Sequence, residues 1–547
     1  MSNTNGRTSV SPEGKFVWGI HKPAYSVKNL RKNIAISELG HTEDGQPVEN
    51  QVNFPQGDLE FQNAQPIVEI PNPFPFWGAT YILTGPADRF AQSAYEFRFS
   101  YPHPKEPEDL LELLVSGKIK GADGNPVDIG LLPRPLRLAA AQTSRNEKVL
   151  TALARLACSL EFSREGKVSG IKFQKGKNGA LTPIIYDYEL FEILGNNPAL
   201  PYDYKLAMVL KPGVQGTSPI VGEFCSGEKS HIWEYLRANS YIPWGHYASN
   251  MAHDCVRYKA SQLSMEDMRG LRHLYYQRIY TQLAISMNME TEFKIDEHSC
   301  SLTEDYLEHI RRKITEKMLE LVEKDIELPY TSTLWGWNYG FDFAPSGYRL
   351  HASHQQVHNQ FALIRPFVNT NGGEAIPSYA IGDMVADFCF NFANACNTPF
   401  FDAYLKAIKN NERTDGKSGL PSSLIIWEDE NVMLFVPKAQ RSQGEIQIIT
   451  KQRAGNILET NSEIRRSLDK AILLAIRTLD NMGAEMVTCG EISKRFDNPD
   501  DDQRLLYFFL PRHCDSPGAF SERQERWITG HYPEDFAEAA RRSMPSI

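Results

Sequence analysis

The sequence lacks three features that would each indicate a class of protein. It has no run of about 18 apolar residues, so no segment is predicted to span a membrane. Its formal net charge is −10, which argues against a surface for nucleic acid or anionic lipid. No two of its eight cysteines are spaced as Cys-x-x-Cys, so the usual zinc-knuckle signature is missing.

The scattered cysteines, together with the lack of a signal peptide, predict free thiols in a reducing cytoplasm. The composition is that of a globular protein, with 41% hydrophobic and 23% charged residues. A chain of 547 residues can bury one large core or about two to four domains. Residues 1–14 are polar and rich in Ser, Asn and Gly, and are predicted to be disordered.

The chemistry is predicted to lie in the stretch 346–364, where three of the fourteen histidines fall within eight residues. In a strand, alternate side chains share a face, so His354, Gln356, His358 and Gln360 would form one polar row. The apolar run that follows and Pro366 favour the strand. Four polar side chains in one row indicate function rather than packing.

Two other interpretations of this stretch remain open. As a helix, it would bring His351, His354 and His358 onto one face, a candidate metal site. As an edge strand, it would simply present a polar row to water.

The elements around this stretch can be predicted from periodicity and caps. Helices are predicted at 264–288 after Ser264 and at 303–325 after Thr303, followed by a strand at 330–340. Gly340 and Gly347 allow tight turns before the histidine strand. Other predicted helices are 107–117, 145–161, 381–394, 399–411, 460–482 and one beginning at Pro533.

Predicted strands lie mainly in the C-terminal part: 423–427, 432–436, 445–450, 485–488 and 504–510. A hairpin with a proline-rich turn joins 67–68 to 80–83. Residues 186–209 are interpreted as two strands, and 167–177 as a solvated turn. A polar linker at 410–421 is a plausible boundary between two halves.

Three stretches resemble the histidine-triad superfamily, in particular its tandem-repeat branch. That branch holds the galactose-1-phosphate uridylyltransferases, the diadenosine tetraphosphate phosphorylases and the GDP-hexose phosphorylases. The resemblance is carried by Asn72-Pro-Phe-Pro-Phe with Gln92, by Asn338-Tyr-Gly340…Gly347…Ser353…His358-Asn-Gln360, and by two C-terminal hairpin stretches, 430–451 and 506–512.

The resemblance implies nucleotidyl transfer or phosphorolysis at a nucleotide phosphate. His358 would be the nucleophile that forms a covalent nucleotidyl-histidine, and Gln360 would donate to a phosphate oxygen. The remaining implied positions would bind substrate: Asn338, Gly340, Gly347, Ser353, His354, Gln356, Asn72 and Gln92. No cofactor is implied, and the expected partner is a nucleotide or sugar nucleotide, not nucleic acid or a membrane.

The sequence departs from the pattern of that branch. Gln356 stands where the first histidine of His-x-His is expected, and the zinc-binding cysteine pair of some uridylyltransferases is missing. The second half has no histidine row. A metal-dependent enzyme using His351, His354 and His358, and a non-catalytic ligand-binding homologue, are therefore kept as alternatives.

The expected fold is α+β, with two histidine-triad-like halves of antiparallel sheet and packed helices in one body. Residues 1–60 would form an extension, 61–380 the first half, and 381–547 the second half. The first half would contain a large insertion at about 98–300. The chain is expected to act alone or as a homodimer.

Overall fold

The structure is a computed structural model, and it describes most of the chain in ranges separated by gaps. The described residues are 8–29, 36–53, 57–62, 64–93, 97–99, 108–175, 181–197, 199–208, 213–215, 218–220, 252–256, 260, 263–289, 291–293, 303–340, 357–484, 486–499, 502–512 and 518–546. They form a mixture of helices and largely antiparallel sheets, which confirms the α+β prediction.

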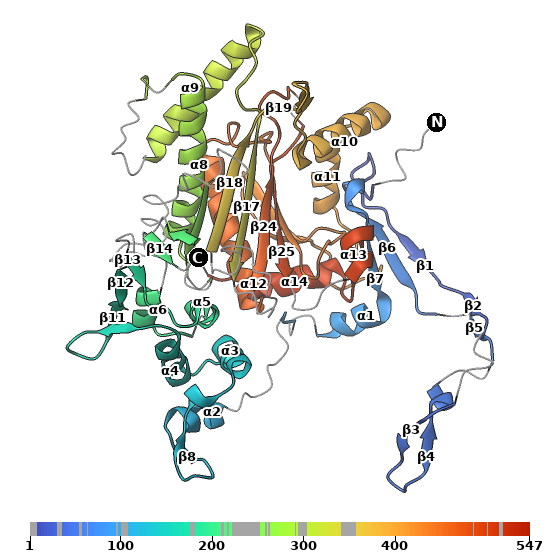
Figure 1. The fold of residues 1–547 in the computed structure, drawn as a ribbon. Helices are drawn as coiled ribbons and strands as arrows, with labels where there is room; N and C mark the ends of the chain where they lie inside the picture. Colours follow the sequence, from blue (N-terminus) through green and yellow to red (C-terminus); the bar gives the residue numbers. More distant parts are fainter. Residues whose placement is uncertain are drawn as a thin grey trace.

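An eight-stranded sheet crosses the centre of the molecule (Figure 1). All of its neighbouring strands pair antiparallel. From one edge to the other, the strands are β16 Ala252–Val256, β18 Val357–Ile364, β17 Ser332–Gly340, β24 Met486–Ile492, β25 Leu506–Arg512, β23 Ile446–Thr450, β22 Val432–Phe435 and β21 Ile425–Glu428. Strands predicted in both the middle and the last part of the sequence therefore share one sheet.

One face of this sheet, called here the α8 face, packs on helices. Its strands contribute alternate apolar residues, among them Trp335, Trp337, Phe361 and Phe509, all nearly inaccessible to water. The helices of this layer are α8 Met265–Ser286, α9 Glu304–Glu323, α12 Ser462–Asn481 and α14 Pro533–Ser543. This layer is the largest core of the described residues, and it stabilises both ends of the sheet.

Local signals explain where these helices begin. Ser264 and Asp267 form a reciprocal capping box at α8. Thr303 and Asn461 accept hydrogen bonds from the first turns of α9 and α12, and Pro533 occupies the first turn of α14. These positions agree with the sequence-based predictions to within a few residues.

The opposite face, called here the α10 face, is covered at the β23–β22 end. There Phe435, Ile449 and Leu506 pack against α10 Ile381–Cys396, α11 Phe400–Lys409 and the ring of Phe74. Phe74 lies 5.2 Å from Phe400 and 5.9 Å from Phe401, measured between ring centroids. This end of the sheet is consequently buried on both faces.

A second, four-stranded sheet joins the two ends of the sequence. Its strands, in order, are β1 Gly19–His21, β6 Ile67–Pro71, β7 Ala79–Leu83 and β26 Arg526–Thr529. The pairs β1–β6 and β6–β7 are antiparallel, whereas β7 and β26 are parallel. The predicted proline-rich hairpin is present, and α1 Thr84–Gln92 follows it.

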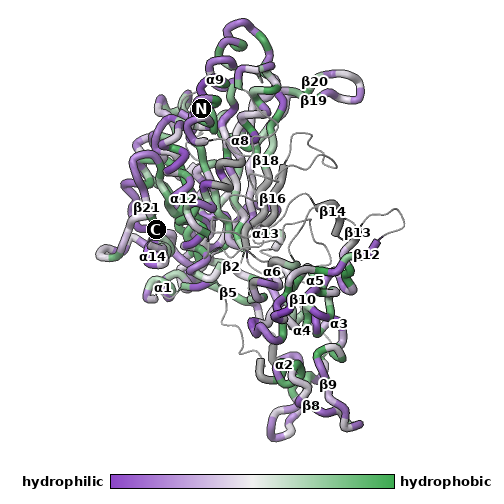
Figure 2. The backbone as a smooth tube through the Cα atoms, turned by 90° about the vertical axis from the view of Figure 1, so that its left-hand side faces the viewer, coloured by the Kyte–Doolittle hydropathy of each residue, from purple (hydrophilic) through white to green (hydrophobic). Residues whose placement is uncertain are grey.

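Residues 108–208 build a smaller lobe with a core of its own, seen apart from the main body in both views (Figures 1 and 2). Its helices are α2 Glu108–Val115, α3 Arg134–Thr143, α4 Glu147–Ala157, α5 Tyr188–Asn196 and α6 Tyr202–Met208. Its strands are β8 Ile119–Lys120, β9 Pro126–Val127, β10 Leu160–Phe162, β11 Val168–Ile171, β12 Phe173–Lys175 and β13 Leu181–Pro183.

The remaining described strands form small hairpins. They are β2 Tyr25–Val27 with β5 Leu59–Phe61, β3 Glu38–His41 with β4 Pro47–Glu49, β14 Gly213–Gln215 with β15 Ser218–Ile220, and β19 Phe367–Asn369 with β20 Ala375–Pro377. Single turns of 3-10 helix occur at Asn50–Asn53, Pro75–Trp77 and Ile129–Leu131. No helix in the described ranges is long and apolar enough to cross a membrane.

Three sequence-based expectations were wrong. The two strands predicted at 186–209 are helices α5 and α6, because Asp187 caps the first of them through Leu190 N–H. The solvated turn predicted at 167–177 contains β11 and β12. Residues 8–14, expected to be disordered, include a buried Val10 that packs with the α10–α11 cluster.

Candidate functional site

The candidate site lies where β18 and β17 pair near one edge of the large sheet. Position 358 is directly opposite Asn338, and position 360 is opposite Gly336. The next strand continues both rows with Thr488 and Gly490. Opposite residues of an antiparallel pair share a face, so these positions all belong to the α10 face.

The edge strand β16 extends the same two rows on the other side of β18. Cys255 is paired with position 358, and His253 with position 360. The rows therefore read Cys255, His358, Asn338, Thr488 and His253, Gln360, Gly336, Gly490. Polar residues and glycine occupy this end of the α10 face, in contrast to the apolar residues at the β23–β22 end.

The accessibility of β17 shows that its two faces differ. Trp335 and Trp337 on the α8 face are 3% and 2% exposed, whereas Leu334 on the α10 face is 42% exposed. The described residues therefore leave Leu334 uncovered, whereas Ala362, directly opposite it on the same face, is only 7% exposed.

Two glycines face one another across the seam between β17 and β24. Among the described residues, the atom nearest to a methyl group added at the α-carbon of Gly336 would be the carbonyl oxygen of Cys489, at 3.8 Å. At Gly490, the same group would collide with the ring of Phe508. No described side chain therefore lies above Gly336, whereas an aromatic ring fills the space above Gly490.

The predicted site residues fall into three groups. Positions His358 and Gln360 lie in β18, and Asn338 and Gly340 lie in β17, so the predicted pair of neighbouring strands is present. A helix through position 358, the alternative interpretation, is wrong. Five predicted residues lie outside the described residues: Gly347, His351, Ser353, His354 and Gln356.

Asn72 and Gln92 belong to the other sheet and its helix. Asn72 is 3% exposed, and its side-chain oxygen accepts a hydrogen bond of 3.1 Å from Phe74 N–H. Its own N–H donates to the Gly78 carbonyl. In the structure Asn72 therefore stabilises the hairpin turn, and Gln92 is the last residue of α1.

The side chain of Asn338 is partly buried, and its oxygen Oδ1 is shielded from solvent without accepting a hydrogen bond in the structure. Leaving a buried acceptor unpaired costs about 1–3 kcal/mol. Among the described residues, no group of three His, Cys, Asp or Glu is placed to hold a metal ion.

Sequence reasoning missed a charged cluster beneath the site, on the α8 face. Arg272 is fully buried, and its Nη2 donates to the hydroxyls of Tyr276 and Tyr507, each at 2.7 Å. Glu491 accepts hydrogen bonds from Tyr275, at 2.8 Å, and from Tyr507. The spacing of Arg272 with tyrosines three and four residues later was the only signal in the sequence.

Burial dominates the electrostatics of this cluster. It raises the pKa of Asp469 to about 8, although Arg272, at 3.7 Å, acts in the opposite direction. The pKa of Glu491 is also raised by burial, with Arg272 and its hydroxyl donors opposing the shift. The guanidinium of Arg272 additionally lies 4.9 Å from the ring centre of Trp335 on β17.

Comparisons with known proteins return only distant structures. No protein-family model and no curated protein matches the sequence. A GalT-like protein from Arabidopsis thaliana is 14% identical with a TM-score of 0.30, and the match covers 44% of this chain and 69% of that one.

Two further solved structures give similar values. A uridylyltransferase is 13% identical, with a TM-score of 0.31 and coverage of 44% and 68%. An ADP-glucose phosphorylase from Arabidopsis thaliana with bound ADP-glucose is 13% identical, with a TM-score of 0.30 and coverage of 44% and 67%. At these values the likeness assigns neither a family nor a reaction to this chain.

Proposed function

We propose that this protein transfers a nucleotidyl group, or cleaves a nucleotide phosphate by phosphorolysis, through a covalent adduct on His358. The observation that carries the proposal is the register of β18 with β17. It puts positions 358 and 360 beside Asn338 and Gly336 on the α10 face, opposite the core of the α8 face. The sequence motif that predicts a nucleophile thus lies on the face of the sheet that does not belong to the largest core.

The chemistry suits these residue types. A neutral imidazole is a nucleophile near pH 7, and its attack on the α-phosphorus forms a P–N bond as the P–O bond to the leaving phosphate breaks. An acceptor phosphate or sugar phosphate then attacks the same phosphorus and releases the imidazole. The amide of Gln360 would donate to an oxygen on which negative charge develops.

The free space above Gly336 supports the same assignment. Glycine lets a ligand approach the sheet backbone closely, and Gly336 lies directly opposite position 360. Thr488 adds a hydroxyl to the row of His358 and Asn338. The substrate class proposed is a nucleotide or sugar nucleotide.

Incubation with a nucleotide labelled at the α-phosphorus tests the proposal. We expect an acid-labile, base-stable adduct on the wild-type protein and none on His358→Asn, because removal of a covalent nucleophile costs several orders of magnitude in rate. His309→Asn is the matched control, since His309 is exposed on α9. A His358→Asn protein with full activity would end the proposal.

A screen of nucleotides and sugar nucleotides by thermal shift would identify the ligand to be labelled. The replacement of the expected first histidine by Gln356 keeps a non-catalytic binding protein as the second candidate function. Tight binding without turnover or adduct across the panel would favour that candidate.

A further inference from the structure

The first strands of the chain form an arm that leaves the body of the protein. β1 pairs with β6 at the edge of the four-stranded sheet, and the hairpins β2–β5 and β3–β4 lie farther out (Figure 1). β2 and β5 pair with each other and with no strand of the two larger sheets. A two-stranded hairpin by itself is marginally stable in water, so a surface that covers it would stabilise the arm.

The hairpin β2–β5 has one apolar face. Tyr25 lies opposite Phe61, and Val27 lies opposite Leu59, so these four side chains share a face of the ladder. The rings of Tyr25 and Phe61 stack with their centroids 4.8 Å apart. Tyr25 and Val27 are each 48% exposed, and Phe61 is 42% exposed. The described residues of this chain therefore leave the apolar face of the hairpin open.

The four-stranded sheet also has an open side. On one side of it, Val68, Ile70 and Ile82 are buried against the body of the protein. The alternate residues face the other side, where Leu83 is 37% exposed and Ile528 is 51% exposed. The described residues thus cover one side of this sheet and leave apolar side chains uncovered on the other.

A pocket lies on this open side, at the root of the arm. It has a volume of about 300 Å³ and is lined by Ile67 and Tyr81 of the sheet and by His21, Lys22 and Pro23. A cavity of roughly 150 Å³ is enough to bind benzene, so this pocket has room for an aromatic ring. None of the four apolar residues of the β2–β5 hairpin lines it, so the rings of the same arm do not fill it.

We propose that the arm and the open side of the sheet belong to one interface between two copies of this chain. In a two-fold dimer, the apolar face of each β2–β5 hairpin packs on the open side of the partner's sheet, with an aromatic ring in the pocket. A two-fold interface requires that one chain carry both parts of every contact, and this chain carries both the apolar hairpin and the pocket.

The area agrees with such a dimer. The exposed parts of the five apolar residues described above on the hairpin and the sheet amount to roughly 400 Å² per chain. A standard interface buries about 800 Å² per partner, of which somewhat more than half is apolar. The inference does not depend on the proposed function, because these residues lie outside the sheet that carries position 358.

Sedimentation equilibrium of the full chain measures the dimer. We expect a dimer for the wild type and a dissociation constant raised at least about 30-fold in Phe61→Ser, because an aromatic anchor buried in an interface is typically worth that much. Ile528→Asp, which puts a charge on the open side of the sheet, should weaken the dimer to a similar extent. All the substituted residues are exposed or nearly so, and circular dichroism should confirm that each variant keeps its fold.

Two further variants are controls. Ser26→Lys changes the other face of the same hairpin, and Leu131→Asp changes a residue of the small lobe that is 68% exposed. Both should leave the dissociation constant of the dimer unchanged.

Mixing the two weakened variants tests whether the arms are exchanged. Each variant homodimer has both of its contacts damaged. A mixed dimer combines the intact hairpin of the Ile528→Asp chain with the intact sheet of the Phe61→Ser chain, so it keeps one of the two contacts. We expect mixed dimers at concentrations at which neither variant dimerises alone.

Three outcomes would overturn the inference. One is a wild-type chain that is a monomer. Another is a dimer whose dissociation constant is unchanged in both Phe61→Ser and Ile528→Asp, which would place the interface elsewhere. The third is a mixture of these two variants that associates no better than either one alone.

Discussion

The strands next to the seam between β17 and β24 follow the same order on both sides. On one side the order is β17, β18, β16, and on the other it is β24, β25, β23. In each case a strand, one or two helices and two further strands follow in sequence, namely β16–α8–α9–β17–β18 and β23–α12–β24–β25. The sheet continues past β23 with β22 and β21, which have no counterparts past β16 among the described strands. The division of the chain into two halves at residue 380 stays a prediction.

The pairing register allows the two sides of the seam to be compared residue by residue. Asn338 faces Thr488 and Gly336 faces Gly490 across the seam, and the next strands carry His358 and Gln360 on one side and Leu510 and Phe508 on the other. One end has polar residues and glycine on the α10 face, and the other has apolar residues that pack against aromatic rings. The same backbone frame thus serves as a candidate site at one end and as a core at the other.

The largest loss of stability is expected at a buried ion pair where the β23–β22 end of the sheet contacts the N-terminal segment. Lys438 and Glu534 are both fully buried and joined at 2.6 Å, and Lys438 Nζ lies 4.4 Å from the ring of Trp18. Lys438→Met leaves a buried carboxylate without its cation, which should lower the free energy of unfolding by about 3–5 kcal/mol. Urea unfolding measures this loss.

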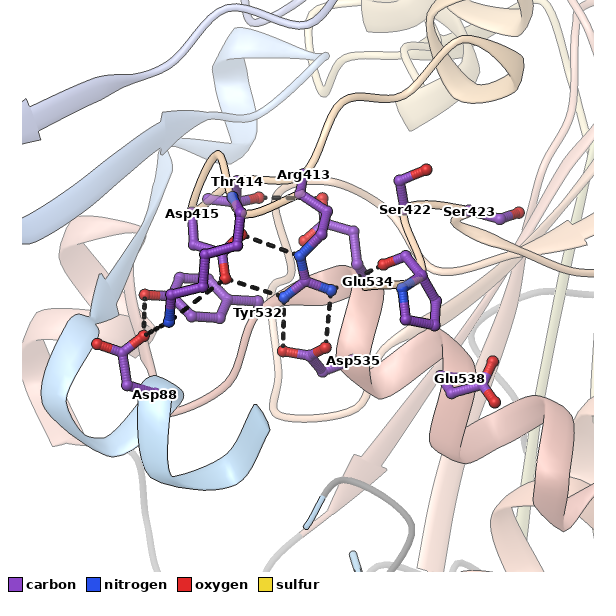
Figure 3. Close-up of polar contacts among 12 residues, drawn as sticks. Asp88, Arg413, Thr414, Asp415, Ser422, Ser423, Tyr532, Glu534, Asp535 and Glu538 are labelled. Atoms are coloured by element: carbon purple, nitrogen blue, oxygen red, sulfur yellow. Dashed lines mark hydrogen bonds and ion pairs between the residues drawn. The ribbon is translucent and has the colours of Figure 1, made fainter. Parts of the chain in front are cut away.

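The double variant Lys438→Met with Glu534→Leu controls that experiment, because it removes both charges and should recover most of the loss. Arg413 forms ion pairs with Asp415 and Asp535 next to this site (Figure 3). The double variant leaves both of these ion pairs unchanged. Nucleotide adduct formation per folded molecule should not change in either variant. A change would mean that the two ends are not independent.

The next effect compares Gln360 with its counterpart Phe508. Gln360→Ala should slow adduct formation roughly 10²-fold, as expected for loss of one donor to a developing charge, with little change in stability. Phe508→Ala should leave adduct formation unchanged and lower the free energy of unfolding by about 2 kcal/mol, because Phe508 is only partly buried. Slower adduct formation in Phe508→Ala, with an unchanged rate in Gln360→Ala, would contradict the comparison.

A third test uses the two glycines at the seam. Gly490→Ala places a methyl group in the ring of Phe508, which stacks with Arg441, and should cost about 1–3 kcal/mol of stability. At Gly336 no described side chain obstructs the methyl group, so Gly336→Ala should leave thermal stability unchanged while slowing turnover, because it narrows the proposed substrate path. Equal loss of stability in both would show that Gly336 is also covered.

A fourth test concerns the charged cluster on the α8 face, which lies beneath both ends of the sheet. Asp469 on α12 has a pKa raised to about 8, above the value of about 3.9 in an unfolded chain. Between these two pKa values the folded state binds more protons than the unfolded state. The free energy of unfolding should therefore fall as pH rises, by at most about 1.4 kcal/mol per pH unit. Asp469→Asn should reduce this pH dependence of the free energy of unfolding. The measurement should cover roughly pH 5 to pH 8, which lies between the two pKa values.

The exposed Glu463→Gln on the same helix is the control and should keep the wild-type pH dependence. If Asp469→Asn retains the wild-type slope, another group of the cluster carries the titration. Glu491, whose pKa is also raised by burial, would then be the next residue to replace.

Local signals predicted the elements that carry the site. Caps at Ser264 and Thr303, Pro533 and the apolar spacing in 460–482 identified the helices of the α8 face, and the apolar run before Pro366 identified β18. The reasoning failed at 186–209, where two strands around a turn were predicted. There the cap at Asp187 and burial of one helical face in the small lobe outweighed β propensity.

The sequence predicted that the strand at 330–340 lies beside the histidine strand, but not which strand lies on its other side. Nothing local shows that Thr488 lies beside Asn338, or that Arg272 is buried among three tyrosines of two distant segments. Both depend on long-range packing of helices against the finished sheet. The sequence also could not show that Asn72, which the motif assigned to substrate, lies in a buried turn of another sheet.

The parallel pairing of β7 with β26 also affects how the protein is made. Residues 79–82 leave the ribosome early, but their partner strand, 526–529, is synthesised last. At about 5–20 residues per second, the interval is on the order of 20–90 s. Throughout that time β7 lacks its parallel partner, so we expect the early hairpin to need protection from other chains until residues 526–529 have been made.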